Sequence, residues 1–221
     1  MKKNYWLAFG LLGFALVAKA QTTDTLGNAK IAIGISTNAY RGDLGQAYDK
    51  WTLAFQGSLL FNHQRRLHGG VHASYGTLTG QAQGARLFEL EVNTANRFFK
   101  TTFFSMHYAL EYDLLRRENI IVYLSQGLGF IRFSPENQFG ESLQNDLSTR
   151  APNETYGNVA AILPTQLGIN YFFANRFGIG SKVGFANYLT DYIDNVSQLG
   201  SNSGNDNALH IQFLFLIPAA F

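Results

Sequence analysis

The sequence predicts an all-β fold: an eight-stranded antiparallel transmembrane β-barrel with short periplasmic turns and long extracellular loops. Three observations predict it: eight segments with an apolar residue at every second position, connectors that alternate between short and long, and a charged content of only 14%. A period of two indicates a strand with one apolar face, because successive side chains of a strand point to opposite sides. No segment after residue 20 has the periodicity of a long helix or the apolar length of a spanning helix.

The first twenty residues have the three parts of a secretory signal peptide. Lys2 and Lys3 give a basic start, residues 5–18 are apolar, and Ala18-Lys19-Ala20 is a small-x-small cleavage site. A transmembrane anchor is the alternative, but the apolar run is shorter than the roughly 20 residues that a spanning helix needs. We therefore expect a signal peptide at residues 1–20 and an outer-membrane β-barrel domain at residues 21–221.

Composition excludes several classes of protein. The chain has 17 basic and 15 acidic residues, and loss of Lys2, Lys3 and Lys19 with the signal leaves 14 against 15. This balance gives no reason to expect nucleic acid or an anionic membrane surface as a partner. The absence of cysteine excludes disulfides, a cysteine zinc site and a lipidated N-terminal cysteine. We expect no cofactor.

Each of the eight segments has one apolar face and one face of small or polar residues. Residues 103–114, for example, place Phe104 and Met106 opposite Ser105 and His107. The predicted strands are residues 30–36, 51–61, 67–77, 103–114, 121–131, 163–173, 177–188 and 210–221. Residues 87–93 also alternate and are expected to extend a strand above the membrane.

The connectors separate a membrane barrel from a secreted β-sandwich, whose strands also alternate. Short turns at residues 62–66, 116–119 and 174–176 alternate with long connectors at residues 38–49, 78–97, 134–160 and 190–207. Short periplasmic turns and long outer loops are typical of transmembrane barrels. The weaker face is rich in Gly, Ser, Ala, Gln and His, which suits a narrow packed lumen better than a solvated surface. Eight strands enclose an interior that side chains just fill, which argues against a general diffusion pore.

Two charged residues are predicted to face this interior. Glu111 and Lys182 both lie on the lumen side by parity, and a desolvated charge is costly unless it is paired. We therefore expect them to neutralise each other. The alternative is that either side chain reaches bulk water near an end of the barrel.

The C-terminal segment is predicted to close the barrel. Its lipid-facing stripe is expected to consist of Ile211, Phe213, Phe215, Ile217 and Phe221, and a terminal aromatic with this alternation resembles the signal read by the outer-membrane assembly machinery. Leu214 and Leu216 make the opposite face apolar too, which predicts a drier lumen beside this strand. Pro218 cannot donate a ladder hydrogen bond, so pairing is expected to weaken there.

Several motifs carry a resemblance to a known family. "TNAYRGDLG", "NRFF", "VYLSQGLGFIRFSP", "LPTQLGINYFFANRFGIGSKVGF" and "LTDYIDNVS" follow one another over residues 31–221. In this order they resemble the small outer-membrane barrels of Bacteroidota, the family that includes the type IX secretion component PorG and shares the OmpA/OmpX-like architecture. The resemblance implies a barrel that docks a protein partner. Ser105 and the stretch "LSTRAPNETYG" depart from the family pattern and favour a divergent paralogue.

The loops offer candidates for ordered structure or ligand binding. Arg41, Gly42 and Asp43 in the first loop, and Asp191, Tyr192 and Asp194 in the fourth, are predicted to form ordered loop structure. Asp191, Asp194 and Asp206 could bind calcium, but turn chemistry explains Asn, Asp and Gly clusters equally well.

Catalysis and metal binding are the weaker interpretations. His68 and His72 share a face, but four residues along a strand span roughly 13 Å, so chelation would need a neighbour such as His107. A hydrolase would combine His210 with Asp206 or a loop serine, yet no nucleophile-elbow pattern occurs.

The function predicted is therefore non-enzymatic. We expect an integral protein of the cell outer membrane, exported by its signal peptide and inserted by the barrel assembly machinery, with outer-membrane lipids around it. It would act as a scaffold or accessory subunit of an outer-membrane complex, as the PorG-like resemblance implies. The alternative is a small-ligand-binding or adhesion barrel that uses its extracellular loops.

Overall fold

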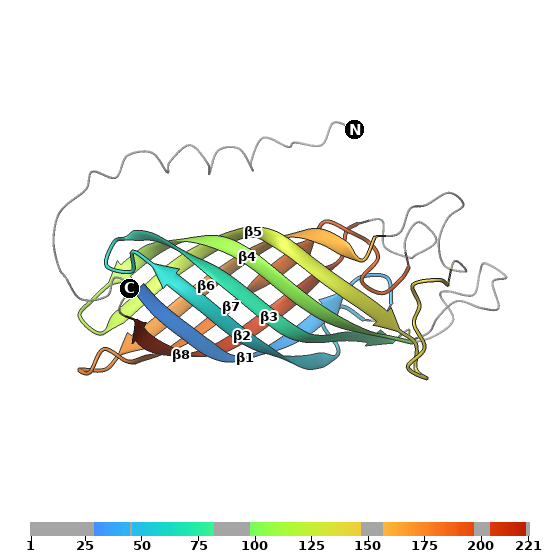
Figure 1. Ribbon diagram of the computed structural model, residues 1–221, viewed down its shortest axis with the longest axis horizontal. Helices are drawn as coiled ribbons and strands as arrows, with labels where there is room; N and C mark the ends of the chain where they lie inside the picture. The colour runs from blue at the N-terminus through green and yellow to red at the C-terminus, as the bar shows by residue number, and fades with distance from the viewer. Residues whose placement is uncertain (1–28, 45, 82–97, 147–156, 197–203, 220–221) are drawn as a thin grey trace, which may run out of the picture.

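Eight antiparallel strands form a closed barrel in the computed structural model, which describes residues 29–44, 46–81, 98–146, 157–196 and 204–219 (Figure 1). Each strand pairs with its neighbours in sequence, and β8 pairs with β1 to close the wall. The strands are β1 (Ala29–Arg41), β2 (Trp51–Phe61), β3 (Leu67–Gln81), β4 (Phe98–Arg116), β5 (Ile120–Glu136), β6 (Val159–Phe172), β7 (Gly178–Tyr188) and β8 (Asn207–Ala219). The predicted fold class and all eight strand positions are confirmed.

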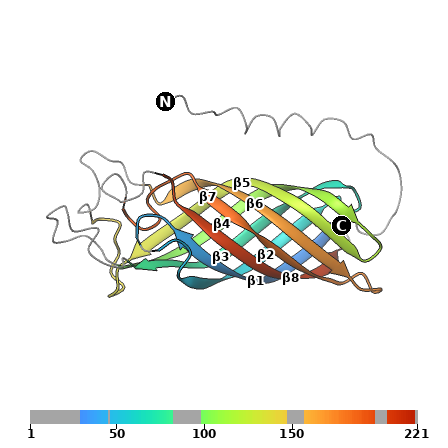
Figure 2. The same cartoon turned by 180° about the vertical axis from the view of Figure 1, so that it is seen from behind.

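Short and long connectors lie at opposite ends of the barrel. The view from behind shows the β2–β3, β4–β5 and β6–β7 turns at the end where β8 finishes, and the described parts of the β1–β2, β5–β6 and β7–β8 connectors at the other end (Figure 2). We call these the turn end and the loop end. No helix in the described part of the chain is long and apolar enough to cross a membrane. The expected signal peptide, residues 87–93 and Phe221 lie outside the described residues.

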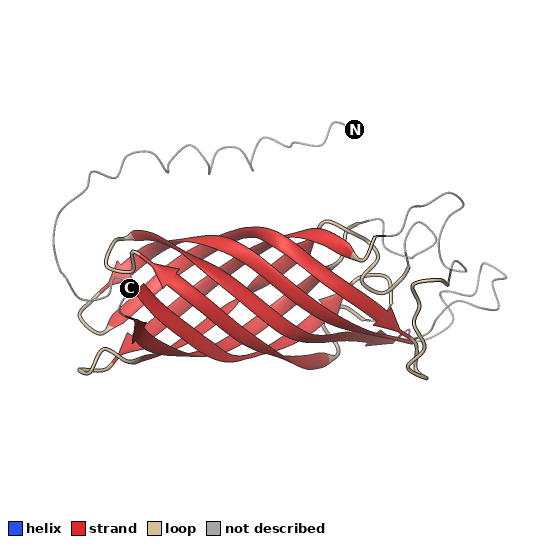
Figure 3. Cartoon of the chain, viewed as in Figure 1, coloured by secondary structure: helices blue, strands red, loops and turns tan. Residues whose placement is uncertain are grey.

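Strands make up the wall of the barrel (Figure 3). The outer surface of this wall is apolar along its whole circumference. Phe55 is 72% exposed and Leu128 is 63% exposed, and every strand contributes outward Ile, Leu, Val, Phe or Tyr side chains. Such a surface is unfavourable in water but matches the hydrocarbon of a bilayer. Closure gives every strand a neighbour on both sides, which a backbone in hydrocarbon requires. The wall is therefore a transmembrane barrel of the outer-membrane type.

Several strands are longer at the loop end than the sequence predicted. β3 continues to Gln81, β4 already begins at Phe98, and β5 continues to Glu136. The pairs in this extension include Gln81 with Phe98 and Lys100 with Glu136. Backbone pairing alone sustains a ladder above the membrane, where the outward face no longer has to be apolar. The apolar alternation that marks the membrane-spanning part consequently underestimated the strands.

The closing strand behaves largely as expected. Phe213 and Phe215 are exposed on the outside, whereas Leu216 is completely buried with Ala32 and Leu60 inside. This apolar cluster confirms a drier lumen beside β8. Pairing with β1 continues through Pro218 to Ala219, but pairing with β7 ends at Leu216.

A second proline interrupts the wall between β5 and β6. Gln126 pairs with Thr165 and Gly129 with Ile162, but the two positions between them lack ladder pairs. The cause is Pro164, whose missing N–H would have donated to the carbonyl of Gly127. The side-chain amide of Gln126 donates to that carbonyl at 3.1 Å instead, so the orphaned acceptor is satisfied on the lipid-facing side.

Candidate functional site: two buried polar networks

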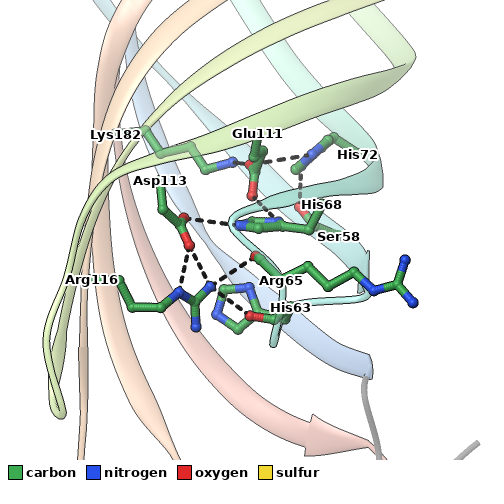
Figure 4. Close-up of polar contacts among 9 residues, drawn as sticks. All are labelled: Ser58, His63, Arg65, His68, His72, Glu111, Asp113, Arg116 and Lys182. Carbon is green, nitrogen blue, oxygen red and sulfur yellow. Dashed lines mark hydrogen bonds and ion pairs between the residues drawn. The ribbon is translucent and has the colours of Figure 1, made fainter. Parts of the chain in front are cut away.

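A buried ion pair lies in the turn-end half of the barrel. The Lys182 ammonium on β7 donates to Glu111 Oε1 on β4 at 2.7 Å, and both side chains are almost fully buried. The structure thus brings together the two residues expected to pair, and neither reaches bulk water. Because β5 and β6 separate β4 from β7 in the wall, the pair crosses the lumen (Figure 4).

Histidines surround the Glu111 carboxylate. His68 Nδ1 lies 3.4 Å from Glu111 Oε2, and His72 Nε2 lies 3.8 Å from Oε1. Both contacts are within ion-pair reach but outside hydrogen-bond geometry. The other nitrogen of each ring has a closer partner: His68 Nε2 is 3.1 Å from Asp113 Oδ1, and His72 Nδ1 is 2.8 Å from Ser58 Oγ.

Asp113 connects this group to the turns. The Arg116 guanidinium donates from Nε to Asp113 Oδ2 at 2.7 Å and also contacts it through a second nitrogen. The same guanidinium donates to the backbone carbonyls of His63 at 2.8 Å and Arg65 at 3.0 Å. A register shift in the β4–β5 ladder between Asp113 and Leu115 accompanies this local geometry. Arg116 therefore holds the β2–β3 turn against the end of β4.

We name this set the turn-end network. Its members are His63, His68, His72, Glu111, Asp113, Arg116 and Lys182. His63 is its apolar-packed member: its ring stacks edge-on against His68 and Phe172, and neither ring nitrogen has a hydrogen-bond partner. Burial, followed by the neighbouring His68, lowers the pKa of His63 well below its ordinary value, so the ring is neutral.

Polar side chains line the middle of the lumen. His72 stacks on His107 with ring centroids 4.9 Å apart, which is the cross-strand neighbour anticipated for a metal site. His210 Nδ1 lies 2.5 Å from Asn38 Oδ1. Within the described residues no group of three or more His, Asp or Glu side chains is arranged to hold a metal ion. These contacts match the interpretation of the histidines as polar lumen packing.

A different network closes the loop end. The Tyr40 hydroxyl on β1 donates to Asp206 Oδ1 at 2.5 Å, and the backbone N–H of Ile193 donates to Asp206 Oδ2 at 3.0 Å. Asp194 accepts from the backbone N–H groups of Leu44 at 3.1 Å and Val196 at 2.9 Å. The first and fourth loops are consequently tied to each other and to β1.

We name this set the outer cap: Tyr40, Leu44, Thr101, Ile193, Asp194, Val196 and Asp206. Ile193 and Val196 are buried in the large apolar cluster of the lumen, and Thr101 donates to the carbonyl of Ile193. A Cβ on Gly42 would lie 1.7 Å from the Tyr40 hydroxyl oxygen and 2.1 Å from Asp206 Oδ1. Glycine is therefore required at position 42 for the hydrogen bond beneath it to form.

Burial makes the cap carboxylates hard to ionise. Burial, and after it the charge of Asp43, raise the pKa of Asp194 to about 7, against the opposing effect of the two backbone donors. Burial and the charge of Asp194 likewise raise the pKa of Asp206 well above its ordinary value. Burial of two carboxylates in one dry site thus raises the pKa of both above the ordinary value of an aspartate.

The residues predicted for the loops take different positions. Asp43 and Asp194 are buried, Asp191 and Tyr192 are half-buried, and Arg41 is exposed. In the cap, the oxygens of Asp194 and Asp206 accept hydrogen bonds from the chain itself, as the turn-chemistry interpretation of these aspartates expects. The serines considered as partners of His210, Ser201 and Ser203, lie outside the described residues.

Sequence reasoning did not predict several contacts within the two networks. Tyr40 and Asp206 are 166 residues apart, so no local pattern indicates their contact. Arg116 and His63 fall in short turns that the sequence marks only as polar. Asp113, on the predicted lumen face, could have indicated its contact with Arg116, because an inward carboxylate at the end of a strand needs a nearby cation.

These observations define a class: a small eight-stranded outer-membrane barrel whose lumen is filled by side chains. Among solved structures, Neisserial surface protein A matches with a TM-score of 0.55 and 11% identity, covering 89% of this chain and 100% of that one. The attachment invasion locus protein Ail of Yersinia pestis matches with a TM-score of 0.49 and 14% identity, covering 87% and 98%. The N-terminal barrel domain of Pseudomonas aeruginosa OprF matches at 0.41 and 9% identity, covering 87% and 99%.

At these identities the likeness concerns the fold. No protein-family model matches the sequence. No curated protein matches it either.

Proposed function

We propose that this chain is an exported, non-enzymatic protein of the outer membrane that acts as a scaffold or accessory subunit of an outer-membrane complex. The observation that carries the proposal is that both ends of the lumen are built for rigidity. At one end Lys182 and Glu111 bridge the barrel, and at the other Asp194 and Asp206 fasten the loops.

The filled lumen favours a role in which the barrel positions a partner at the outer membrane. Tyr123, Phe133 and Tyr188 are almost completely buried inside, along with the ion pair. A barrel of this size that fills its interior presents two things to other molecules, its rims and its lipid-facing wall. An ordered rim offers a binding surface without the entropic cost of ordering loops on association.

The motifs that resemble the Bacteroidota barrels support a more specific version. In it, the protein is a PorG-like member or a divergent paralogue, placed beside a secretion complex of type IX. The same motifs "RGDLG" and "LTDYIDNVS" supply Leu44, Asp194 and Val196 of the outer cap, so the docking surface would be the cap and its neighbouring loops.

Affinity purification from native membranes tests the proposal. The full chain, carrying an affinity tag, is extracted in mild detergent, and Tyr40→Phe serves as the cap-loosening variant. We expect a stoichiometric protein partner with the wild type and a weaker yield of that partner with Tyr40→Phe. A wild-type barrel that migrates as folded but recovers no stoichiometric partner would refute the scaffold. Binding of a small ligand through the loops would then favour the ligand or adhesion barrel.

A further inference from the structure

Arginine is found in every short turn of the barrel. The β2–β3 turn carries Arg65 and Arg66, the β4–β5 turn Arg117, and the β6–β7 turn Arg176, and all four are exposed. The acidic residue of these turns is Glu118. Lys30, half-buried at the start of β1, adds a further positive charge at the same end, over the ring of Phe172 at 4.7 Å. The near-neutral total charge of the chain conceals this concentration of positive charge at one end.

The turns hold three of these arginines in place. The backbone N–H of Arg65 donates to Asn62 at 2.9 Å, that of Arg117 to Ile120 at 2.8 Å, and that of Arg176 to Phe173 at 2.9 Å. Arg176 has a φ of 68°, a left-handed conformation that is unusual for a residue with a Cβ. Figure 4 shows the Arg65 side chain extending away from the turn-end network, whose ion pair with Asp113 uses Arg116 instead.

Aromatic side chains fix the depth of these charges. Tyr171 and Phe173 contact each other beside the β6–β7 turn with ring centroids 5.4 Å apart, and Phe177 stacks on Phe215 at 5.8 Å. Aromatic girdles mark the boundary between hydrocarbon and head groups. Turns this short cannot carry an arginine far beyond that boundary, so we expect the guanidinium groups at the level of the lipid phosphates.

We infer that the turn end is a ring-shaped binding surface for the phosphates of anionic phospholipids in the periplasmic leaflet. The occupant is a lipid because the charges are distributed over all three turns around the barrel, as the lipid annulus is, and not gathered on one side. Guanidinium groups bind phosphate oxygens through paired hydrogen bonds. Each basic residue near an anionic surface strengthens association by about five-fold. The loop end has no such arrangement among its described residues: there, basic side chains alternate with the aspartates and glutamates of the loops.

Lipid retention provides the test. The full chain is reconstituted in nanodiscs of equimolar phosphatidylglycerol and phosphatidylcholine with the same acyl chains, and the lipids retained after mild detergent extraction are counted by native mass spectrometry. We expect the wild type to retain phosphatidylglycerol preferentially. In the turn variant the preference should fall by roughly ten-fold or more. The turn variant is Arg65→Gln, Arg66→Gln, Arg117→Gln and Arg176→Gln.

Two controls decide the result. A matched loop-end variant should keep the wild-type preference: Arg41→Gln, Lys50→Gln, Lys100→Gln and Arg132→Gln. A variant with the four turn arginines changed to lysine should keep most of the wild-type preference for phosphatidylglycerol. This result would show that the glutamine variant loses its preference because it loses charge and not because it misfolds. Equal retention of the two lipids by the wild type, or an equal loss in the loop-end variant, would overturn the inference. Loss of the bound lipid on adding inorganic phosphate would assign the surface to a soluble anion and would overturn it as well.

Discussion

At the turn end of the lumen buried carboxylates face cations, whereas at the loop end they face a tyrosine hydroxyl and backbone N–H groups. Glu111 and Asp113 are neutralised by Lys182 and Arg116. Among the described residues no cation pairs with Asp194 or Asp206, and both keep their protons to a higher pH. The first arrangement ties strands of the wall together, and the second ties loops to the wall.

Because of this difference, variants at the two ends should destabilise the barrel in different ways. Breaking the turn-end network leaves a buried charge within the wall and should weaken the whole barrel. Breaking the outer cap frees a segment that is fastened at only a few points, so it should open locally while the wall persists.

The largest effect is expected from Lys182→Met. It removes the cation that neutralises Glu111 and leaves that carboxylate buried, which costs about 3–5 kcal/mol of unfolding free energy. Urea unfolding in detergent, followed by tryptophan fluorescence, measures the loss. Adding Glu111→Gln to the same chain should recover much of it. A double variant as unstable as Lys182→Met would show that packing and not charge is responsible.

Tyr40→Phe is expected to have an intermediate and local effect. It removes the hydroxyl that donates to Asp206 and leaves a buried oxygen without this partner, which costs about 1–3 kcal/mol. Hydrogen exchange should accelerate at Ile193 and Val196, with little change in the strands. Gly42→Ala should act in the same way, because its Cβ would occupy the space of that hydrogen bond.

The outer cap should respond to pH in a defined direction. The pKa of Asp194 is about 7 in the folded cap and 3.8 ordinarily, so the closed cap holds a proton that the opened loop has released. Stability of the cap is thus greatest below pH 4, falls as the pH rises to 7, and then stays constant. Exchange at Val196 should be faster at pH 8 than at pH 5 after correction for the intrinsic rate. Asp194→Asn should flatten this dependence, and an unchanged slope would contradict the assignment.

The smallest effect is expected from His63→Phe. Both ring nitrogens of His63 are buried without a hydrogen-bond partner, so an aromatic ring without polar atoms should change the unfolding free energy by no more than about 1 kcal/mol. The matched change His68→Phe breaks the contact with Asp113 and should cost more. Equal losses for the two variants would show that His63 has a polar role in the folded barrel.

The sequence predicted the wall well and the networks only in part. Alternation located all eight strands because lipid contact imposes an apolar residue at every second position, as at Phe213 and Phe215. The same parity placed Glu111 and Lys182 inside, because on these strands the inward face follows directly from the outward one. Above the membrane that constraint ends, and the extension of β4 from Phe98 to Thr102 was missed.

The contacts that were missed depend on how the chain returns to itself. Tyr40 meets Asp206 only because β1 and β8 close the barrel, and Arg116 reaches the carbonyls of His63 and Arg65 only because two turns lie side by side. Local patterns define each residue's face but not its partner across the lumen. Strand register and loop conformation determine that partner, and neither is visible in a single segment.

A direct comparison of Lys182→Met and Tyr40→Phe tests the central claim that the two ends hold different parts of the molecule. Hydrogen exchange is measured along the described strands and over Thr190–Val196 in both variants and the wild type. The account predicts faster exchange throughout the wall for Lys182→Met, and faster exchange confined to the cap for Tyr40→Phe. The same exchange pattern in both variants would contradict it.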